Sequence, residues 1–159
     1  MKLSICIPTY NRSYYLMRLL NNIYEQYSET VEVVVVNDGS TDNTINVVES
    51  FYDKINVSLH NQVNLGRATA LKKAINSSSC EFTLLMDDED LFVKGGLNLI
   101  LESLELLSSN KNQNQNLSGI VFLTQDINNS IIGSQFPYSP MISNLVKINA
   151  DFKVRGDKK

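Results

Sequence analysis

The sequence predicts an α/β protein built on a mostly parallel sheet with helices on both faces. Segments with the pattern of a buried strand alternate four times with segments that have the pattern of an amphipathic helix. Such alternation is typical of βαβ units, whose right-handed crossovers place the loops after the strands at one edge of the sheet. In an open α/β sheet, ligands bind at this edge.

The strands are predicted from short apolar runs that stop at polar or turn-forming residues. They are residues 3–8, 31–36, 56–59 and 81–86. Pro8 ends the first strand because it has no amide hydrogen to donate. The second strand is a β-branched run (VEVVVV), which is expected of a strand covered on both faces.

The helices are predicted from apolar residues that recur every three or four positions. Ser13 can cap the first helix, and Thr41 or Asp42 can cap the second. A glycine-bearing turn at residues 64–67 precedes the third helix, and a glycine pair at residues 95–96 precedes the fourth. The residues expected on buried helix faces are Leu16, Leu19, Leu20, Ile23, Tyr24, Tyr27, Ile45, Val48, Phe51, Ala70, Leu71, Ala74, Ile75, Leu97, Ile100, Leu101, Leu104 and Leu107.

The last third of the chain has weaker patterns. Residues 108–116 (SSNKNQNQN) form a polar stretch that predicts a surface loop. Residues 119–124 predict another strand, and residues 126–133 predict a hairpin with its turn at residues 128–130. The charged end of the chain predicts an unstructured tail.

Composition and charge exclude some classes of function. The net charge of −3 and the pI near 5.1 argue against a nucleic-acid partner, which usually requires a basic face. Cys6 and Cys80 lack CxxC spacing, so we expect two buried thiols in a reducing compartment, the cytoplasm. No apolar run approaches the length of a transmembrane helix, and no secretory leader is expected. Peripheral membrane association stays open.

Four consecutive acids, Asp87, Asp88, Glu89 and Asp90, follow the fourth predicted strand. Their mutual repulsion would be relieved by a bound cation. Mg²⁺ and Mn²⁺ prefer oxygen ligands, and Mg²⁺ is often shared between carboxylates and substrate phosphates. The alternative is a solvated acidic run in which Glu89 and Asp90 complement the dipole of the next helix.

Other polar residues lie in the loops expected at the same edge. They are Tyr10, Arg12, Asp38, Gly39, Asn64 and Arg67. Together with the acids, they supply what a nucleoside diphosphate needs, which is an aromatic wall, a carboxylate for the base, a cation for phosphate and a bridging metal. The alternatives are that Asp38 forms a turn or caps a helix and that Arg12 is a surface charge.

Four short motifs occur in order along the chain. They are SICIPTYNR at residues 4–12, VVVNDGSTDNT at residues 34–44, NLG at residues 64–66 and the acidic element at residues 84–97. In sequence and spacing they resemble the family 2 glycosyltransferases, which have the GT-A (Rossmann-like) fold. The resemblance implies a nucleotide-sugar-binding domain at residues 1–125 and the start of an acceptor-side region at residues 126–159.

The resemblance also implies a reaction and a site. A sugar, most commonly from a UDP-sugar, would pass to a hydroxyl of a glycan or lipid-linked acceptor, as in cell-envelope polysaccharide biosynthesis. Asp38 would recognise the base and Arg67 would reach phosphate. A Mn or Mg cation would be held by Asp87, Glu89 and Asp90. The implied nucleotide-binding residues are Pro8, Thr9, Tyr10, Arg12, Asp38, Gly39, Asn64, Gly66, Arg67, Asp87 and Asp88.

Two features depart from the family pattern. Glu89 stands where the family usually has aspartate, and its longer side chain changes the reach toward a metal. The family's acceptor-binding half is not matched, so we expect a fragment that binds donor but transfers sugar poorly. No catalytic residue is assigned, and Asp126 and Asp151 are the late aspartates that could act as the base.

Two other functions compete with sugar transfer. One is a non-catalytic nucleotide-binding module that needs a partner to complete it. The other is a phosphoryl-transfer domain with a flavodoxin-like sheet, which also places acids at strand ends. The second alternative is weakened because the sequence has neither a GxxxxGK[ST] loop nor a GxGxxG motif.

Overall fold

The computed structural model describes residues 2–109 and 120–133. The chain divides into two units, residues 1–117 and 118–159, and each is described by itself. The elements of the first unit are β1 (Leu3–Thr9), α1 (Ser13–Glu25), β2 (Val31–Asn37), α2 (Thr44–Glu49), β3 (Val57–Asn61), α3 (Arg67–Ser77), β4 (Phe82–Leu85) and α4 (Gly96–Ser109). The second unit contains a hairpin of β5 (Thr124–Gln125) and β6 (Ile131–Ile132).

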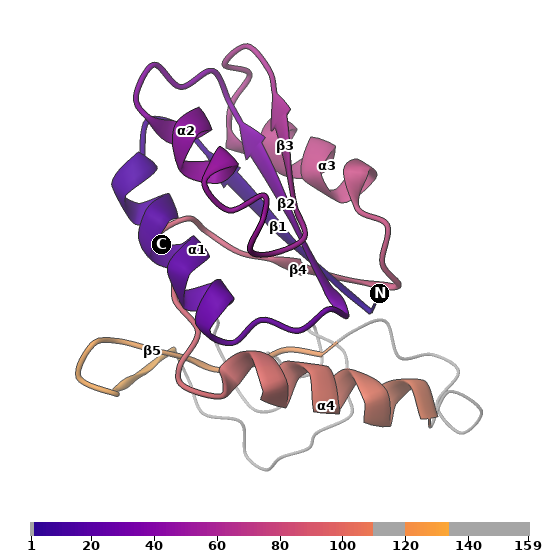
Figure 1. Ribbon diagram of the computed structural model, residues 1–159. Coiled ribbons are helices and arrows are strands. Elements are labelled where there is room, and N and C mark those ends of the chain that lie inside the picture. The colour runs from indigo at the N-terminus through magenta and orange to yellow at the C-terminus, as the bar shows by residue number, and fades with distance from the viewer. Residues whose placement is uncertain (1, 110–119, 134–159) are drawn as a thin grey trace. The chain divides into compact units, whose positions relative to one another are not determined.

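The strands of the first unit form one parallel sheet in the order β3-β2-β1-β4 (Figure 1). Thr9 at the end of β1 pairs with Asn37 at the end of β2, and Asn37 pairs with Asn61 at the end of β3. Cys6 pairs with Leu85, so β4 ends at the same edge. The chain moves outward from β1 to β3 and then returns to the other side of β1, so the strand order reverses between β1 and β4.

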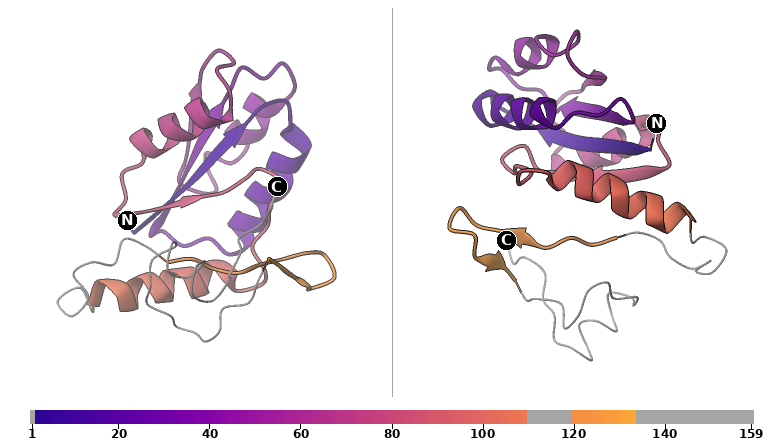
Figure 2. Two further views of the ribbon diagram at one scale, coloured as in Figure 1. Left: turned by 180° about the vertical axis from the view of Figure 1, so that it is seen from behind. Right: turned by 60° about the horizontal axis from the view of Figure 1, so that its bottom comes forward.

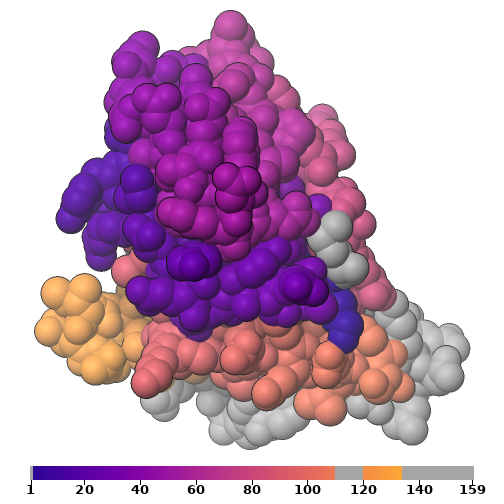
Figure 3. Space-filling view, viewed as in Figure 1, coloured from indigo at the N-terminus to yellow at the C-terminus, as the bar shows by residue number. Residues whose placement is uncertain are grey.

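Both faces of the central strands are buried. Every residue of β1 is buried, and on one face of the sheet Cys6 and Val34 pack against Ala70 and Ala74 of α3. The helices α1 and α2 lie on the other face (Figures 1 and 2), and their side chains form much of the surface seen in Figure 3. The predicted parallel sheet with helices on both faces is confirmed.

Most of the residues expected on buried helix faces are buried, but Tyr27, Leu71, Leu101 and Leu107 are only half-buried and three others are exposed. The buried positions are Leu16, Leu19, Leu20 and Ile23 in α1, Val47 and Val48 in α2, Ala70 and Ala74 in α3, and Leu97, Ile100 and Leu104 in α4. Tyr24, Ile45 and Ile75 are exposed instead. Each stands at the margin of the apolar stripe formed by the buried residues of its helix. Cys6 is buried as expected, but Cys80 is only half-buried.

The start of α1 differs from the expectation. Ser13 is the first helical residue rather than the cap, and Arg12 before it makes no capping hydrogen bond. The amide of Ser13 instead donates to Asp42 at 2.9 Å, and the amide of Thr44 at the start of α2 donates to the same carboxylate at 3.1 Å. The cap position of α2 is held by Asn43, which makes no capping hydrogen bond, so neither Thr41 nor Asp42 is the cap itself. Asp42 lies one residue before the cap, and its carboxylate accepts from amides at the N-termini of both helices.

In the second unit, where the sequence predicts a strand at residues 119–124 and a hairpin at residues 126–133, the observed hairpin pairs only Thr124–Gln125 with Ile131–Ile132. Residues 120–123 are not a strand, because among the described residues none pairs with them and a strand needs a hydrogen-bonded neighbour. The predicted turn is confirmed, with Asp126 accepting hydrogen bonds from the amides of Asn128 and Ser130 at 2.8 and 2.9 Å. The first two residues of the loop expected at residues 108–116 are helical instead, because α4 continues to Ser109. The rest of that expected loop, the tail and Asp151 lie outside the described residues. Within those residues, no helix has the length and apolar character to cross a bilayer.

Candidate functional site

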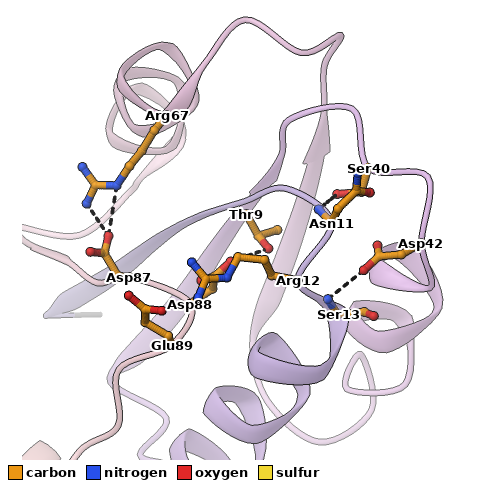
Figure 4. Close-up of polar contacts among 10 residues, drawn as sticks. All are labelled: Thr9, Asn11, Arg12, Ser13, Ser40, Asp42, Arg67, Asp87, Asp88 and Glu89. Carbon is orange, nitrogen blue, oxygen red and sulfur yellow. Dashed lines mark hydrogen bonds and ion pairs between the residues drawn. The ribbon is translucent and has the colours of Figure 1, made fainter.

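The centre of the candidate site joins β1 to the segment after β4. Thr9 Oγ1 donates to Asp88 Oδ2 at 2.8 Å, and both residues are buried. Arg12 Nε lies 3.3 Å from Asp88 Oδ1, and the same guanidinium pairs with Glu89. It also lies 4.8 Å from the centre of the Tyr15 ring. Side chains therefore link the two strands between which the strand order reverses (Figure 4).

A second arginine reaches the acidic segment from α3. Arg67, the first residue of this helix, donates through Nε to Asp87 Oδ1 at 3.1 Å, and a terminal nitrogen of its guanidinium pairs with the same oxygen. The amide of Asp90 donates to the carbonyl of Asp87 at 3.2 Å and closes a turn. The structure thus brings both predicted nucleotide-binding arginines, Arg12 and Arg67, to the predicted acids as ion pairs.

Burial has the largest influence on the charge of Asp88. It raises the pKa of the Asp88 carboxyl above its ordinary value of 3.8, and the hydrogen bond from Thr9 and the charge of Arg12 offset this only in part. In Arg12, the hydrogen bond to Glu89 raises the pKa of the guanidinium above its ordinary value. The site therefore holds a permanent cation beside a carboxylate whose desolvation is not fully compensated.

Asp38 is buried at the end of β2 and holds the turn before α3. Its Oδ1 accepts from Gln62 Nε2 and from the amide of Leu65, and its Oδ2 accepts from the amide of Gly66, each at 2.8 Å. Burial alone raises the pKa of Asp38, but these three hydrogen bonds outweigh it and hold the pKa below 3.8. Both carboxylate oxygens are therefore engaged by the protein itself.

Gly39 is required where the β2 loop meets the same turn. Its φ is +80°, and a Cβ at this position would lie 2.8 Å from the amide nitrogen of Asn64. Gly66 also has a positive φ of +89°, but nothing lies within 4 Å of the position of its Cβ. Gly39 thus meets both a conformational and a steric requirement, whereas Gly66 meets only the first.

Other predicted residues line this edge without forming the ion pairs. Pro8 lies in β1 opposite Val36, and Tyr10 after it is 46% exposed. Asn64 and Gly66 are exposed in the turn before α3. Asp126 belongs to the second unit, where its carboxylate forms the hairpin turn.

Sequence reasoning missed residues that connect these loops. Asn11 bonds to Ser40 and Thr41 of the β2 loop, and Gln62 donates to Asp38. Asn11 has a φ of +52°, and asparagine is one of the few residues enriched in this conformation. The only available signal was therefore the residue type, because the partners are 24 to 30 positions away in sequence.

The acids match a hard divalent cation in chemistry but not in their present arrangement. Carboxylate oxygens are the donors that Mg²⁺ and Mn²⁺ prefer. Within the part of the chain that the structure describes, however, no three potential ligands converge as a metal site. Asp87, Asp88 and Glu89 instead face the guanidinium groups of Arg67 and Arg12.

The family follows from comparison with known sequences. Residues 4–109 match the profile described as Glycosyl transferase family 2. The chain belongs to this family. The resemblance carried by the four motifs is thereby confirmed.

Curated relatives of this family 2 chain are bacterial glycosyltransferases. It is 39% identical over 102 residues to the poly(ribitol-phosphate) beta-N-acetylglucosaminyltransferase TarS of Staphylococcus aureus, covering 59% of this chain and 17% of TarS. It is 29% identical over 104 residues to the GalNAc(5)-diNAcBac-PP-undecaprenol beta-1,3-glucosyltransferase of Campylobacter jejuni, covering 64% of this chain and 34% of that protein. The chain thus spans only a minor part of these relatives.

Solved structures show the same fold. TarS 1-349 in complex with UDP-GlcNAc has a TM-score of 0.59 at 28% identity, covering 77% of this chain and 37% of that chain. The mannosyltransferase PcManGT from Pyrobaculum calidifontis, in complex with GDP-Man and Mn²⁺, has the same TM-score and identity, covering 64% and 31%. The family 2 chain therefore has the expected GT-A fold.

Proposed function

We propose that this family 2 chain binds a nucleoside diphosphate sugar where β1 and β4 end, for transfer of the sugar to an acceptor hydroxyl. The observation that carries the proposal is the meeting of Arg12 and Arg67 with the acids after β4, at the reversal of strand order. Open α/β sheets bind ligands at such reversals. Family membership supports the same reading.

The two arginines are the proposed phosphate ligands. Their planar guanidinium groups suit phosphate oxygens, which can accept two parallel hydrogen bonds. The present ion pairs are partly exposed, with the side chain of Arg67 65% exposed and that of Asp87 22% exposed. Exposed ion pairs contribute only about 0–1 kcal/mol. A diphosphate can therefore replace Asp87 as the partner of Arg67 at low cost.

A Mn or Mg cation is part of the proposal. Asp87, Glu89 and Asp90 are its candidate ligands, because they follow β4 directly and carry oxygen donors. When bound, the cation supplies positive charge to the diphosphate oxygens. The Mn²⁺ complex of the Pyrobaculum protein supports this choice.

The nucleoside is proposed to lie against Tyr10, with uracil as the base. Tyr10 offers a half-exposed ring beside the site, and TarS has been crystallised with UDP and UDP-GlcNAc. Asp38 is proposed to act by holding the turn at Leu65 and Gly66, since both of its oxygens are already bonded. The relatives' names support a cell-envelope glycan or a lipid-linked acceptor.

Titration calorimetry with UDP, with Mn²⁺ or with EDTA, tests this function. Mn²⁺ is expected to strengthen UDP binding to the wild-type chain. The double variant Asp87→Ala/Glu89→Ala should lose this gain and retain binding in EDTA, because both arginines stay available. The matched control is Glu49→Ala/Asp53→Ala, which removes two exposed acids in and after α2.

Two results would contradict the proposal. No UDP binding by the wild-type chain under either condition would overturn the nucleotide site. A full Mn²⁺ gain in the Asp87→Ala/Glu89→Ala variant would overturn the assignment of the metal ligands and leave the nucleotide site standing.

A further inference from the structure

The loop that carries Arg12 is fastened to the loop after β2 on both sides of Arg12. The amide of Asn11 donates to Ser40 Oγ at 2.9 Å, and Asn11 Oδ1 accepts from the amide of Thr41 at 2.7 Å. On the other side, the amide of Ser13 donates to Asp42 at 2.9 Å. Figure 4 shows Arg12 between these attachments, with its guanidinium turned toward Asp88 and Glu89. We call the Asn11 bonds to Ser40 and Thr41 the latch.

The latch coincides with an uncommon backbone conformation. Asn11 has a φ of +52°. Apart from glycine, few residues other than asparagine and aspartate adopt this conformation. Such a conformation persists only where surrounding contacts hold it. The latch supplies these contacts, one through the main chain of Asn11 and one through its side chain.

The direction of Arg12 depends on this backbone. A free arginine side chain has many rotamers, and ordering it for a ligand costs entropy. Here the chain before Arg12 is fixed by the latch, and the guanidinium is further held over the Tyr15 ring and beside Asp88. The guanidinium is therefore ordered before a ligand arrives.

We propose that Asn11 is a positioning residue that holds Arg12 ready for the diphosphate, an inference that rests on the proposed nucleotide site. Asn11 acts through the main chain before Arg12. Its contribution is therefore to the phosphate part of a nucleotide and not to the nucleoside. Without Arg12, the latch has no effect on nucleotide affinity.

Three substitutions of Asn11 separate the side-chain bond from the backbone conformation. Asn11→Ala removes the acceptor for Thr41 and disfavours the positive φ. Asn11→Gly keeps the conformation accessible but removes the acceptor. Asn11→Asp keeps both, because aspartate also tolerates this conformation and offers the same acceptor oxygen. Ser40→Ala breaks the other bond of the latch and leaves Asn11 unchanged.

The experiment measures affinities for UDP and for uridine by calorimetry in the full 159-residue chain. A neutral hydrogen bond corresponds to a factor of about two to ten, so Asn11→Ala, Asn11→Gly and Ser40→Ala should weaken UDP binding by that factor. Uridine affinity should not change, and Asn11→Asp should bind UDP as the wild type does. In an Arg12→Gln background, Asn11→Ala should have no further effect. Asn46→Ala, an exposed asparagine of α2, is the control.

The failures of the inference and of the proposed function are distinguishable. If UDP does not bind to the wild type, the proposed function falls and the inference falls with it. Two results would overturn the positioning role while leaving the nucleotide site standing. In one, UDP binds and the loss of UDP affinity caused by Asn11→Ala adds fully to the loss caused by Arg12→Gln. In the other, Asn11→Ala lowers the affinity for uridine as much as the affinity for UDP. UDP affinity equal to that of the wild type in both Asn11→Gly and Ser40→Ala would also overturn the positioning role. Thermal unfolding of each variant verifies that the variant is folded.

Discussion

Replacing Asp38 by alanine should destabilise the fold by about 3 kcal/mol. The substitution leaves the amides of Leu65 and Gly66 without their carboxylate acceptor, and it also removes the bond from Gln62. A hydrogen bond to a charged group contributes about 1.5–3 kcal/mol. We take the lower figure for each of the two amides because Leu65 and Gly66 are exposed and water can replace part of the loss. Gln62 can rotate to solvent and adds little.

Urea unfolding followed by circular dichroism measures this difference, and its pH dependence identifies the cause. Asp38 has a pKa below 3.8 in the folded chain. A carboxylate with a lowered pKa stabilises the fold above its unfolded pKa, and this stability is lost as the pH falls through its folded pKa. The gap in unfolding free energy between wild type and Asp38→Ala should therefore be constant above about pH 4 and should narrow at lower pH.

The exposed Asp53 provides the matched control. Asp53→Ala should change the free energy of unfolding by less than about 0.5 kcal/mol, as surface substitutions usually do. If Asp38→Ala lowered the free energy of unfolding by less than about 1 kcal/mol, the hydrogen bonds to the carboxylate would contribute less than charged hydrogen bonds usually do, and the reasoning would be refuted. A gap that does not narrow at acid pH would refute it as well, because the effect would then not depend on the carboxylate charge.

Three further substitutions test the same edge of the sheet. Gly39→Ala should destabilise the chain by about 2–4 kcal/mol, because the added Cβ would lie 2.8 Å from the Asn64 amide nitrogen and the backbone has a positive φ. Gly66→Ala should destabilise it by only about 1–2 kcal/mol, because its φ is also positive but no atom lies within 4 Å of the added Cβ. Equal losses in urea unfolding would contradict the steric argument. Asp88→Asn should leave stability at pH 7 nearly unchanged, because it removes the charge whose burial is poorly compensated and Arg12 keeps Glu89 as a partner. The same substitution should weaken UDP binding. A large loss of stability with normal UDP affinity would assign Asp88 to the fold instead.

The fold was predictable because its signals are local. The β-branched run of β2 and the three- and four-residue spacing in α1 each lie within one element, and the parallel order follows from their alternation. The exceptions lie where a neighbour decides. Ile45 fits the apolar stripe of α2 but lies at its margin, and residues 120–123 are apolar but have no partner strand among the described residues.

The loops of the site were predictable, but their internal contacts were not. The positions at which the predicted strands end indicated which residues would lie at one edge of the sheet. Thr9, Arg12 and Asp88 do lie together there. No local pattern shows that Asp42 serves the N-termini of two helices or that Asn11 reaches the β2 loop. These contacts depend on how two loops meet after the sheet has formed, which the spacing of residues in either loop does not encode.

The two buried aspartates of this edge illustrate how a structural role and a binding role differ. Asp38 and Asp88 are 3% and 4% exposed, so both lose hydration on folding. For Asp38, three hydrogen bonds outweigh the loss of hydration, and the pKa of its carboxyl is lowered. For Asp88, the Thr9 hydroxyl and the partly exposed Arg12 do not fully offset that loss, and the pKa of its carboxyl is raised. A carboxylate held at a cost to the fold is typical of a functional site. The arrangement around Asp88 therefore favours a role in ligand binding. Asp38 already has hydrogen-bond partners for both of its oxygens within the fold, so its burial is explained by a structural role.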